Sequence, residues 1–169
     1  MNSILTEKEY QRFIMDHLER EQGYIVRKDT YFDRFHAMDR DMLFKFLKDT
    51  QPNIMATLGK MYGDQLEDTV VNYLNSEMTK ARGSLLNVLK HGIEINGMHL
   101  DLMYTRPATD FNQDLMKKYG QNIFSVMEEV WASDKERVDL VIFLNGLPII
   151  SFELKCNVAA QSYQDAIHQ

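Results

Sequence analysis

The chain has 169 residues, a length that suits about one domain with a sizeable hydrophobic core. Its hydrophobic content of 44% is ordinary for a globular protein, and its apolar runs are too short for a membrane span or a signal peptide. The net charge of −6 argues against a protein that coats DNA on its own, because such proteins are normally basic. The single cysteine, Cys156, excludes an internal disulfide and suggests a reducing cytoplasm.

A capping box opens the first predicted helix, because Thr6 and Glu9 have the Thr-x-x-Glu spacing. We expect the helix to run to about Gln22, with Gly23 directly after its end. Its predicted apolar face consists of Tyr10, Phe13, Ile14 and Leu18.

Two polar residues, Glu7 and Gln11, lie on the same helical stripe as Ile14 and Leu18. Such a pair indicates either a site at this end of the helix or a solvated first turn that the helix dipole favours. Both interpretations remain open at this point.

The segment 39–90 is predicted to be mostly helical, because its apolar residues recur at helical spacing. One stripe consists of Met42, Leu43, Phe46 and Leu47, and the other of Leu66, Val70, Tyr73 and Leu74. Pro52, Gly59 and Gly63 are expected to separate the helices.

Strands are expected only from His91 onward. An Asn-Gly turn at 96–97 between two apolar segments predicts a hairpin. A short helix over 112–119 and a strand over 124–132 follow. Helices, hairpin, strand and a second hairpin in this order predict an α+β fold, with a mixed sheet flanked by helices.

The second hairpin, VDLVIFLNGLPIISFELK at 138–155, is the most informative segment. Asp139 opens its first apolar strand, and the triplet Glu153-Leu154-Lys155 closes the second. We expect both strands to be buried on two faces, because LVIFL and LPIISF are continuously apolar. Polar residues at the ends of buried strands are typical of functional sites.

The residue types at these strand ends suit metal-assisted phosphodiester hydrolysis. Asp139 and Glu153 supply oxygen ligands for Mg²⁺, and the Leu154 carbonyl is a further candidate. Lys155 can orient a water molecule or offset charge on the phosphate. This pattern resembles the PD-(D/E)xK nuclease signature. The alternative is a hairpin whose charged ends simply lie in water.

The nuclease interpretation makes a prediction about strand register. A regular two-residue turn at 145–146 would set Asp139 opposite Phe152, and Glu153 would then point to the other face. A three-residue loop or a β-bulge would instead set Asp139 opposite Glu153. We therefore predict one of these irregularities.

Longer strings carry a resemblance to a known family. HGIEINGMHLDLMYTRPATDFN from His91, RVDLVIFLNGLPIISFELK from Arg137, and QSYQDAIHQ at the end of the sequence resemble the N-terminal nuclease domain of the R subunit of type I restriction enzymes. The similarity covers most of 85–169 and extends more loosely over the N-terminal helices.

The resemblance implies a restriction-endonuclease-like core and a type I site-specific deoxyribonuclease that cleaves double-stranded DNA with Mg²⁺, for which Mn²⁺ is expected to substitute. By the match, Asp139 and Glu153 are the metal ligands and Lys155 is the catalytic lysine. The implied partners are methylation and specificity subunits, and no membrane association is expected. ATP is expected to act only through a translocase outside this sequence, because no Walker A motif is present.

The sequence departs from the family pattern at two places. The family has a Gln-x-x-x-Tyr motif after the lysine, but no such tyrosine is present here; Gln161 or Gln164 is the candidate substitute for its glutamine. The family's acidic residue on the first helix is assigned to Glu7, because the better-spaced position holds Gln11.

The overall expectation is a single nuclease domain over 1–169, with a helical part at about 1–90 and a sheet-bearing core at about 91–169. The apolar stripe of a helix over 159–169 stops without a capping signal, so we expect a piece of a longer chain that continues into an ATP-dependent translocase. The alternatives are another PD-(D/E)xK nuclease of repair or recombination, and a non-catalytic docking module with the same fold.

Overall fold

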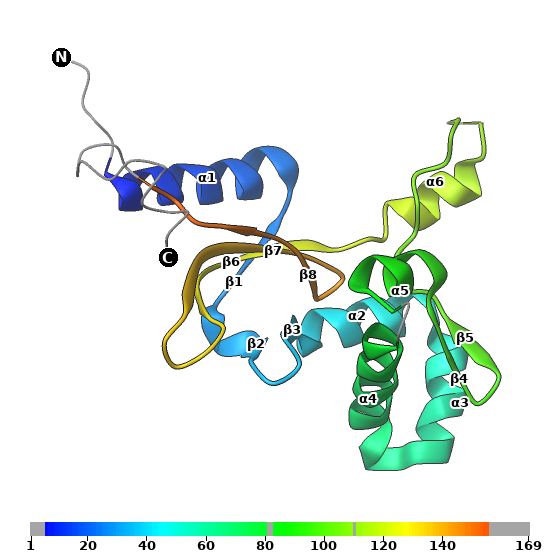
Figure 1. Ribbon diagram of the computed structural model, residues 1–169. Coiled ribbons are helices and arrows are strands. Elements are labelled where there is room, and N and C mark those ends of the chain that lie inside the picture. The colour runs from blue at the N-terminus through cyan, green and yellow to red at the C-terminus, as the bar shows by residue number, and fades with distance from the viewer. Residues whose placement is uncertain (1–5, 81–82, 110, 156–169) are drawn as a thin grey trace.

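The computed structural model describes residues 6–80, 83–109 and 111–155 (Figure 1). They form an α+β fold, as predicted, with a four-stranded mixed sheet in the order β1-β6-β7-β8. β1 is parallel to β6, and the other neighbours are antiparallel. The strands are β1 (Ile25–Arg27), β6 (Phe124–Trp131), β7 (Arg137–Leu144) and β8 (Leu147–Phe152).

The prediction of β6, β7 and β8 is confirmed, but the expectation that strands begin at His91 is wrong. β1 pairs in register with Ser125, Val126 and Met127 of β6, which lie far along the chain. A strand of three residues is too short for a clear period-two pattern, and its parallel partner cannot be inferred from its neighbours in sequence.

The first helix, α1 (Glu7–Gln22), begins and ends as predicted. The Thr6 hydroxyl accepts the N–H of Glu9, and the Glu9 carboxylate accepts the N–H of Thr6. The hydrogen bond from the Thr6 main chain, followed by that from its hydroxyl, lowers the pKa of Glu9. Gly23 ends the helix in the left-handed conformation, with φ 69°.

The predicted apolar face of α1 is only partly correct. Tyr10 and Phe13 are exposed, with 63% of Phe13 open to solvent. The residues that pack on the sheet are Gln11, Ile14, Met15 and Leu18. The contact face is therefore rotated from the expected one and includes a buried glutamine.

The sheet is covered on both faces (Figure 1). α1 lies on one face, where Met15 packs with Leu140 and Ile142 of β7. On the opposite face, Phe32 packs against Phe143 with ring centroids 6.1 Å apart. Phe32 belongs to a small sheet beside this face, formed after η1 (Asp29–Tyr31) by β2 (Phe32–Asp33) and β3 (Met38–Asp39).

The β7–β8 hairpin contains the predicted irregularity. It begins with the pairs Leu144–Leu147 and Phe143–Pro148, and the register then shifts between Ile142 and Phe143. Ile149 is left as the extra residue of a β-bulge on β8. The pairs after the shift are Ile142 with Ile150, Val141 with Ser151 and Leu140 with Phe152. The prediction of a bulge or an odd loop is confirmed.

The two strands of this hairpin differ in burial. β7 is buried from Leu140 to Leu144, as its sequence predicts. β8 is an edge strand, and 47% of Ile150 is exposed. The expectation that β8 is buried on two faces is wrong, because Ile150 and Ser151 are exposed and only Leu147 of the strand is fully buried.

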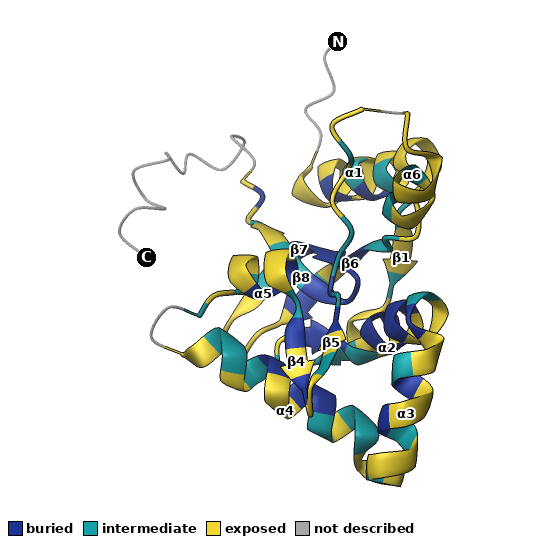
Figure 2. Cartoon of the chain, turned by 90° about the vertical axis from the view of Figure 1, so that its right-hand side faces the viewer, coloured by how far each residue is buried: buried dark blue, intermediate teal, exposed yellow. Residues whose placement is uncertain are grey.

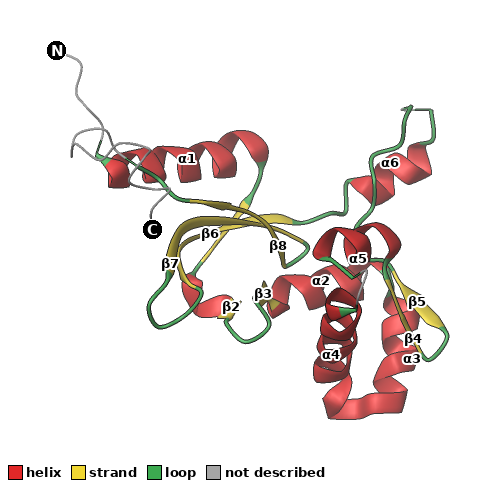
Figure 3. Cartoon of the chain, viewed as in Figure 1, coloured by secondary structure: helices red, strands yellow, loops and turns green. Residues whose placement is uncertain are grey.

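Helices fill most of the segment 39–90, as predicted (Figure 3). They are α2 (Arg40–Thr50), α3 (Pro52–Tyr62), η2 (Gly63–Gln65), α4 (Leu66–Thr79) and α5 (Leu85–His91). Pro52 opens α3 and Gly63 follows its end, but Gly59 lies inside α3 and does not break it. Tyr73 of the second stripe is exposed, whereas the rest of both stripes packs into the core. None of the helices in the described parts is long and apolar enough to cross a membrane.

The remaining predicted elements that fall within the described residues are confirmed. The Asn-Gly turn joins β4 (Ile93–Ile95) and β5 (Met98–Leu100), which form a separate two-stranded sheet on the helical part. The short helix α6 (Gln113–Tyr119) precedes Gly120, and the Asn112 side chain caps its first turn. The buried residues gather where the helices meet the sheet (Figure 2).

Asn145 in the β7–β8 turn ties the sheet to the helical part. Its side chain is fully buried, with 0% exposure. Oδ1 accepts the N–H of Ile123 at 2.7 Å, and the amide donates to the Leu102 carbonyl at 2.9 Å and to Asn122 Oδ1 at 3.1 Å. The Asn-Gly-Leu-Pro turn is therefore a structural junction.

Asp39 forms the second junction beside the same turn. Its N–H donates to the Gly146 carbonyl at 2.8 Å, and its carboxylate caps α2 by accepting the N–H of Met42. Arg27 of β1 donates to both carboxylate oxygens, at 2.8 Å and 3.2 Å. The hydrogen bond to Asp39 is the main reason that the pKa of Arg27 is raised. This buried pair joins β1, α2 and the hairpin.

Candidate functional site

Asp139 lies opposite Glu153 at the open end of the β7–β8 hairpin. The last recorded pair is Leu140 with Phe152, and one further step in the same register matches Asp139 with Glu153. Asp139 Oδ2 also accepts the main-chain N–H of Leu154 at 2.7 Å. The structure therefore brings Asp139 to the Glu-Leu-Lys triplet.

The triplet alternates between buried and exposed side chains. Leu154 is buried in the cluster that includes Met15 of α1, and Phe152 packs against the same cluster. Since successive residues of an extended chain point to opposite sides, Glu153 points away from α1. Glu153 and Lys155 are both exposed. A regular continuation of the register would set Asp139 on the same face as Glu153, because cross-strand partners point the same way.

The candidate centre consists of two carboxylates and one ammonium group. Within the described residues, no group of three or more His, Cys, Asp or Glu side chains is arranged to hold a metal ion. In the part of the chain that the structure describes, neither Asp139 Oδ1 nor the Glu153 carboxylate has a hydrogen-bond partner; Asp139 is half-buried and Glu153 is exposed. Two carboxylates and a main-chain carbonyl are hard oxygen donors of the kind that Mg²⁺ prefers.

A buried glutamine on α1 approaches the candidate centre from the other side of the sheet. The Gln11 amide donates to Glu128 Oε2 on β6 at 3.1 Å and to the Asp139 carbonyl at 3.4 Å. Gln11 is only 6% exposed. Of the two polar residues on the α1 stripe, Gln11 is therefore the one in contact with the site, whereas Glu7 is exposed.

The other proposed supporting residues, Gln161 and Gln164, lie outside the described residues, as do Cys156 and the expected helix over 159–169.

Comparison with known protein families shows to which family the chain belongs. The family described as "Type I restriction enzyme R protein N terminus" matches residues 4–169. The chain belongs to this family. No curated protein and no solved structure matches it. Membership connects this R protein N terminus with a multi-subunit restriction complex that acts on DNA.

Sequence reasoning missed Glu128 of the R protein N terminus. The sequence signal was a carboxylate inside the apolar strand FSVMEEVW. Glu128 follows two residues after the buried Val126 and therefore lies on the same face of β6, toward α1. Its partner Gln11 is 117 positions away in sequence, so their contact had no local signal.

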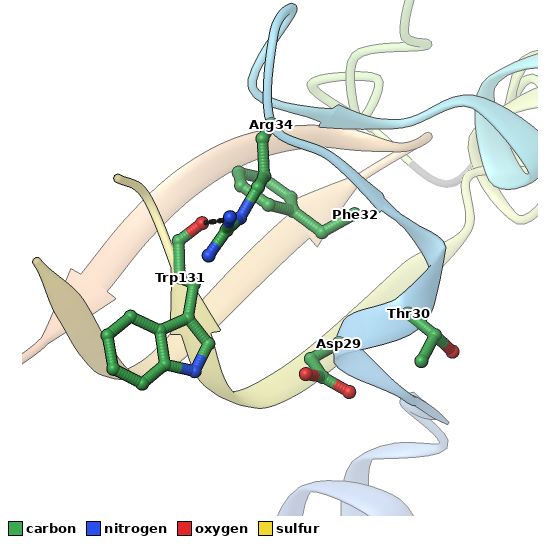
Figure 4. Close-up of a pocket in the computed structure, with 5 residues that line it drawn as sticks. All are labelled: Asp29, Thr30, Phe32, Arg34 and Trp131. Carbon is green, nitrogen blue, oxygen red and sulfur yellow. Dashed lines mark hydrogen bonds between the residues drawn. The ribbon is translucent and has the colours of Figure 1, made fainter. Parts of the chain in front are cut away.

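A hollow of the surface lies at the C-terminal end of β6, where Trp131 pairs with Arg137 of β7 (Figure 4). It has a volume of about 250 Å³ and is lined by Asp29, Thr30, Phe32, Arg34 and Trp131. The Arg34 guanidinium donates to the Trp131 carbonyl at 3.0 Å and pairs with Asp134 at 3.3 Å. These residues are distinct from those at the Asp139–Glu153 end of the hairpin.

Proposed function

We propose that the chain is the Mg²⁺-dependent endonuclease module of a type I restriction enzyme, which cleaves double-stranded DNA. The observation that carries this proposal is the bulged register of β7 and β8. Continued by one residue, this register sets Asp139 opposite Glu153, and Lys155 follows two residues after Glu153 in the sequence. Membership of the R protein family supports the same activity.

The residues present fit a magnesium ion. Asp139 Oδ2 is held by the N–H of Leu154, which fixes the orientation of the carboxylate and leaves Oδ1 for a cation. Glu153 is exposed and adds a second negative oxygen donor. The Leu154 carbonyl is the third proposed ligand. Oxygen donors of this kind match the preference of Mg²⁺.

Each side chain has a defined role in the proposed reaction. When bound, the metal polarises the scissile phosphate and lowers the pKa of an attacking water. Asp139 and Glu153 hold the cation, and their negative charge requires its presence before a phosphate can approach. The Lys155 ammonium orients the water by hydrogen bonding or stabilises negative charge on the pentacovalent transition state.

The charge of the chain indicates that other parts of the enzyme deliver DNA to this site. At −6, the chain has little attraction for a polyanion, and non-specific DNA binding depends on neutralising phosphates. In this proposal, the methylation and specificity subunits and an ATP-driven translocase supply DNA binding and movement. The complex would act in the cytoplasm.

Metal titration tests the proposal. Mg²⁺ or Mn²⁺ should raise the melting temperature of the chain, because a ligand that binds only the folded state stabilises it. Asp139→Asn or Glu153→Gln should abolish this rise, and Lys155→Ala should retain it. A Glu153→Gln chain with an undiminished rise would refute the assigned metal site. A non-catalytic docking module without a metal site would show no rise in any of the four proteins.

A further inference from the structure

Gln11 is an unusual residue for the position that it occupies. It lies in the contact between α1 and the sheet, on the helix face that also carries the apolar residues Met15 and, two turns on from Gln11, Leu18. Burying an amide is unfavourable unless its polar atoms have partners. An apolar side chain of similar length would fill this position without that requirement. The presence of glutamine therefore calls for a role beyond packing.

The two contacts of the Gln11 amide define its orientation. Both partners, Glu128 Oε2 and the Asp139 carbonyl, are acceptors, so the NH₂ group and not the amide oxygen must face them. The bond to Glu128 joins α1 to β6, and the bond to Asp139 joins α1 to β7. Only the second reaches a residue of the candidate metal centre.

Asp139 is thereby held at two points. Its carbonyl accepts from Gln11 of α1, and its carboxylate accepts from the N–H of Leu154 after β8. Leu154 is itself buried in the cluster that includes Met15 of α1. Asp139 is therefore linked to α1 by Gln11 and, through Leu154, by this cluster, so a shift of the Asp139 main chain also displaces its carboxylate from Leu154.

We infer that Gln11 is a positioning residue, whose amide fixes the main chain of Asp139 and through it the direction of the Asp139 carboxylate. Glu128 serves as the anchor that holds the amide in place. The expected effect of Gln11 on metal binding rests on the proposed function. The expected effect of Gln11 on the Asp139–Leu154 hydrogen bond is independent of the proposed function.

The test compares variants of the metal-free chain by hydrogen exchange of individual amides. Gln11→Met keeps the length of the side chain and removes both donors. Leu18→Ala is the matched control, because it weakens the packing of α1 without touching Gln11 or Asp139. We expect Gln11→Met to lower the protection of the Leu154 amide by about tenfold more than that of Ile142 in the centre of β7. In Leu18→Ala, the two amides should lose protection together.

A double variant that exchanges Gln11 and Glu128 separates the attachment of α1 to β6 from the positioning of Asp139. Gln11→Glu combined with Glu128→Gln restores a hydrogen bond between α1 and β6 with donor and acceptor reversed, but it leaves no donor for the Asp139 carbonyl. The double variant should therefore be more stable than Gln11→Glu alone while Leu154 remains poorly protected. Recovery of Leu154 protection in the double variant would overturn the inference.

Magnesium affinity distinguishes this inference from the proposed function. Gln11→Met should weaken Mg²⁺ binding by about tenfold, as is usual for residues that orient metal ligands. Equal protection losses at Leu154 in Gln11→Met and Leu18→Ala would overturn the inference. A selective loss of protection at Leu154 in Gln11→Met, together with a wild-type chain that binds no Mg²⁺, would uphold the role of Gln11 and refute the metal site.

Discussion

The carboxylate of Asp139 accepts the main-chain N–H of Leu154 at 2.7 Å, which fastens the acid of β7 to the middle of the Glu-Leu-Lys triplet. Leu154 is buried against α1, so the triplet is fixed by a hydrogen bond and by packing. Glu153 and Lys155, on either side of it, remain exposed to solvent. This arrangement holds the main chain in place while the charged groups stay free to bind.

Two variants of Asp139 should differ in stability because of this hydrogen bond. In Asp139→Asn, the side-chain carbonyl can still accept from Leu154, so we expect the free energy of unfolding to change by less than about 1 kcal/mol. In Asp139→Ala, the partly buried N–H loses its partner, and we expect a loss of about 1–3 kcal/mol. Urea unfolding measures both. Equal losses in the two variants would show that the bond contributes nothing.

Gly146→Ala should be far more damaging than Gly97→Ala. Both glycines have positive φ, 81° and 75°, so an alanine at either position costs roughly 1–2 kcal/mol in backbone strain. At Gly146, a Cβ would also lie 2.3 Å from the Asp39 carbonyl oxygen, whereas at Gly97 nothing lies within 4 Å. We expect Gly146→Ala to separate the hairpin from α2, with a much larger fall in melting temperature. Similar melting temperatures for the two variants would contradict this junction.

Asn145→Asp should destabilise the fold strongly. The Asn145 amide donates to the Leu102 carbonyl and to Asn122 Oδ1, and a carboxylate would direct negative charge at both acceptors in a fully buried position. We expect a loss of more than about 2 kcal/mol, measured by chemical denaturation near neutral pH. Asn145→Asp should regain part of this loss at low pH, where the new acid is protonated. A loss that does not change with pH would argue against burial of the charge.

Asp33 should make the free energy of unfolding depend on pH in the acidic range. Partial burial raises the pKa of Asp33, but hydrogen bonds from the side chain and main chain of His36 outweigh it and hold the pKa below its usual value. A lowered pKa means that the unfolded chain binds more protons, so this contribution is present above about pH 4 and is lost as the pH falls further. The stability difference between wild type and Asp33→Asn should therefore shrink below about pH 4. A constant difference down to about pH 3 would contradict it.

Local signals in the sequence predicted much of the fold. The capping box at Thr6, the Asn-Gly turn at 96–97 and the stripes of 39–90 depend on residues within one or two turns of each other. The bulge was predicted from function, because only a shifted register pairs Asp139 with Glu153. No local pattern specified that Ile149 is the extra residue.

Contacts between distant residues were not predictable in the same way. The predicted apolar face of α1 included Tyr10 and Phe13, but the face that packs on the sheet includes Gln11 and Met15 instead. β8 has the composition of a buried strand and yet lies at the sheet edge, since strand order depends on the whole topology. For the same reason, the contact between Gln11 and Asp139 was absent from the sequence-based site.

Cleavage of supercoiled double-stranded DNA measures whether Asp139, Glu153 and Lys155 form a nuclease site. The assembled type I complex would be supplied with Mg²⁺ and ATP and would carry either wild-type R subunit or its Glu153→Gln or Lys155→Ala variant. We expect both variants to assemble and to hydrolyse ATP like wild type, but to cut DNA at least about a hundredfold more slowly, because the metal ligand or the positioned ammonium is missing. Cutting at the wild-type rate by both variants would contradict the assignment of this site.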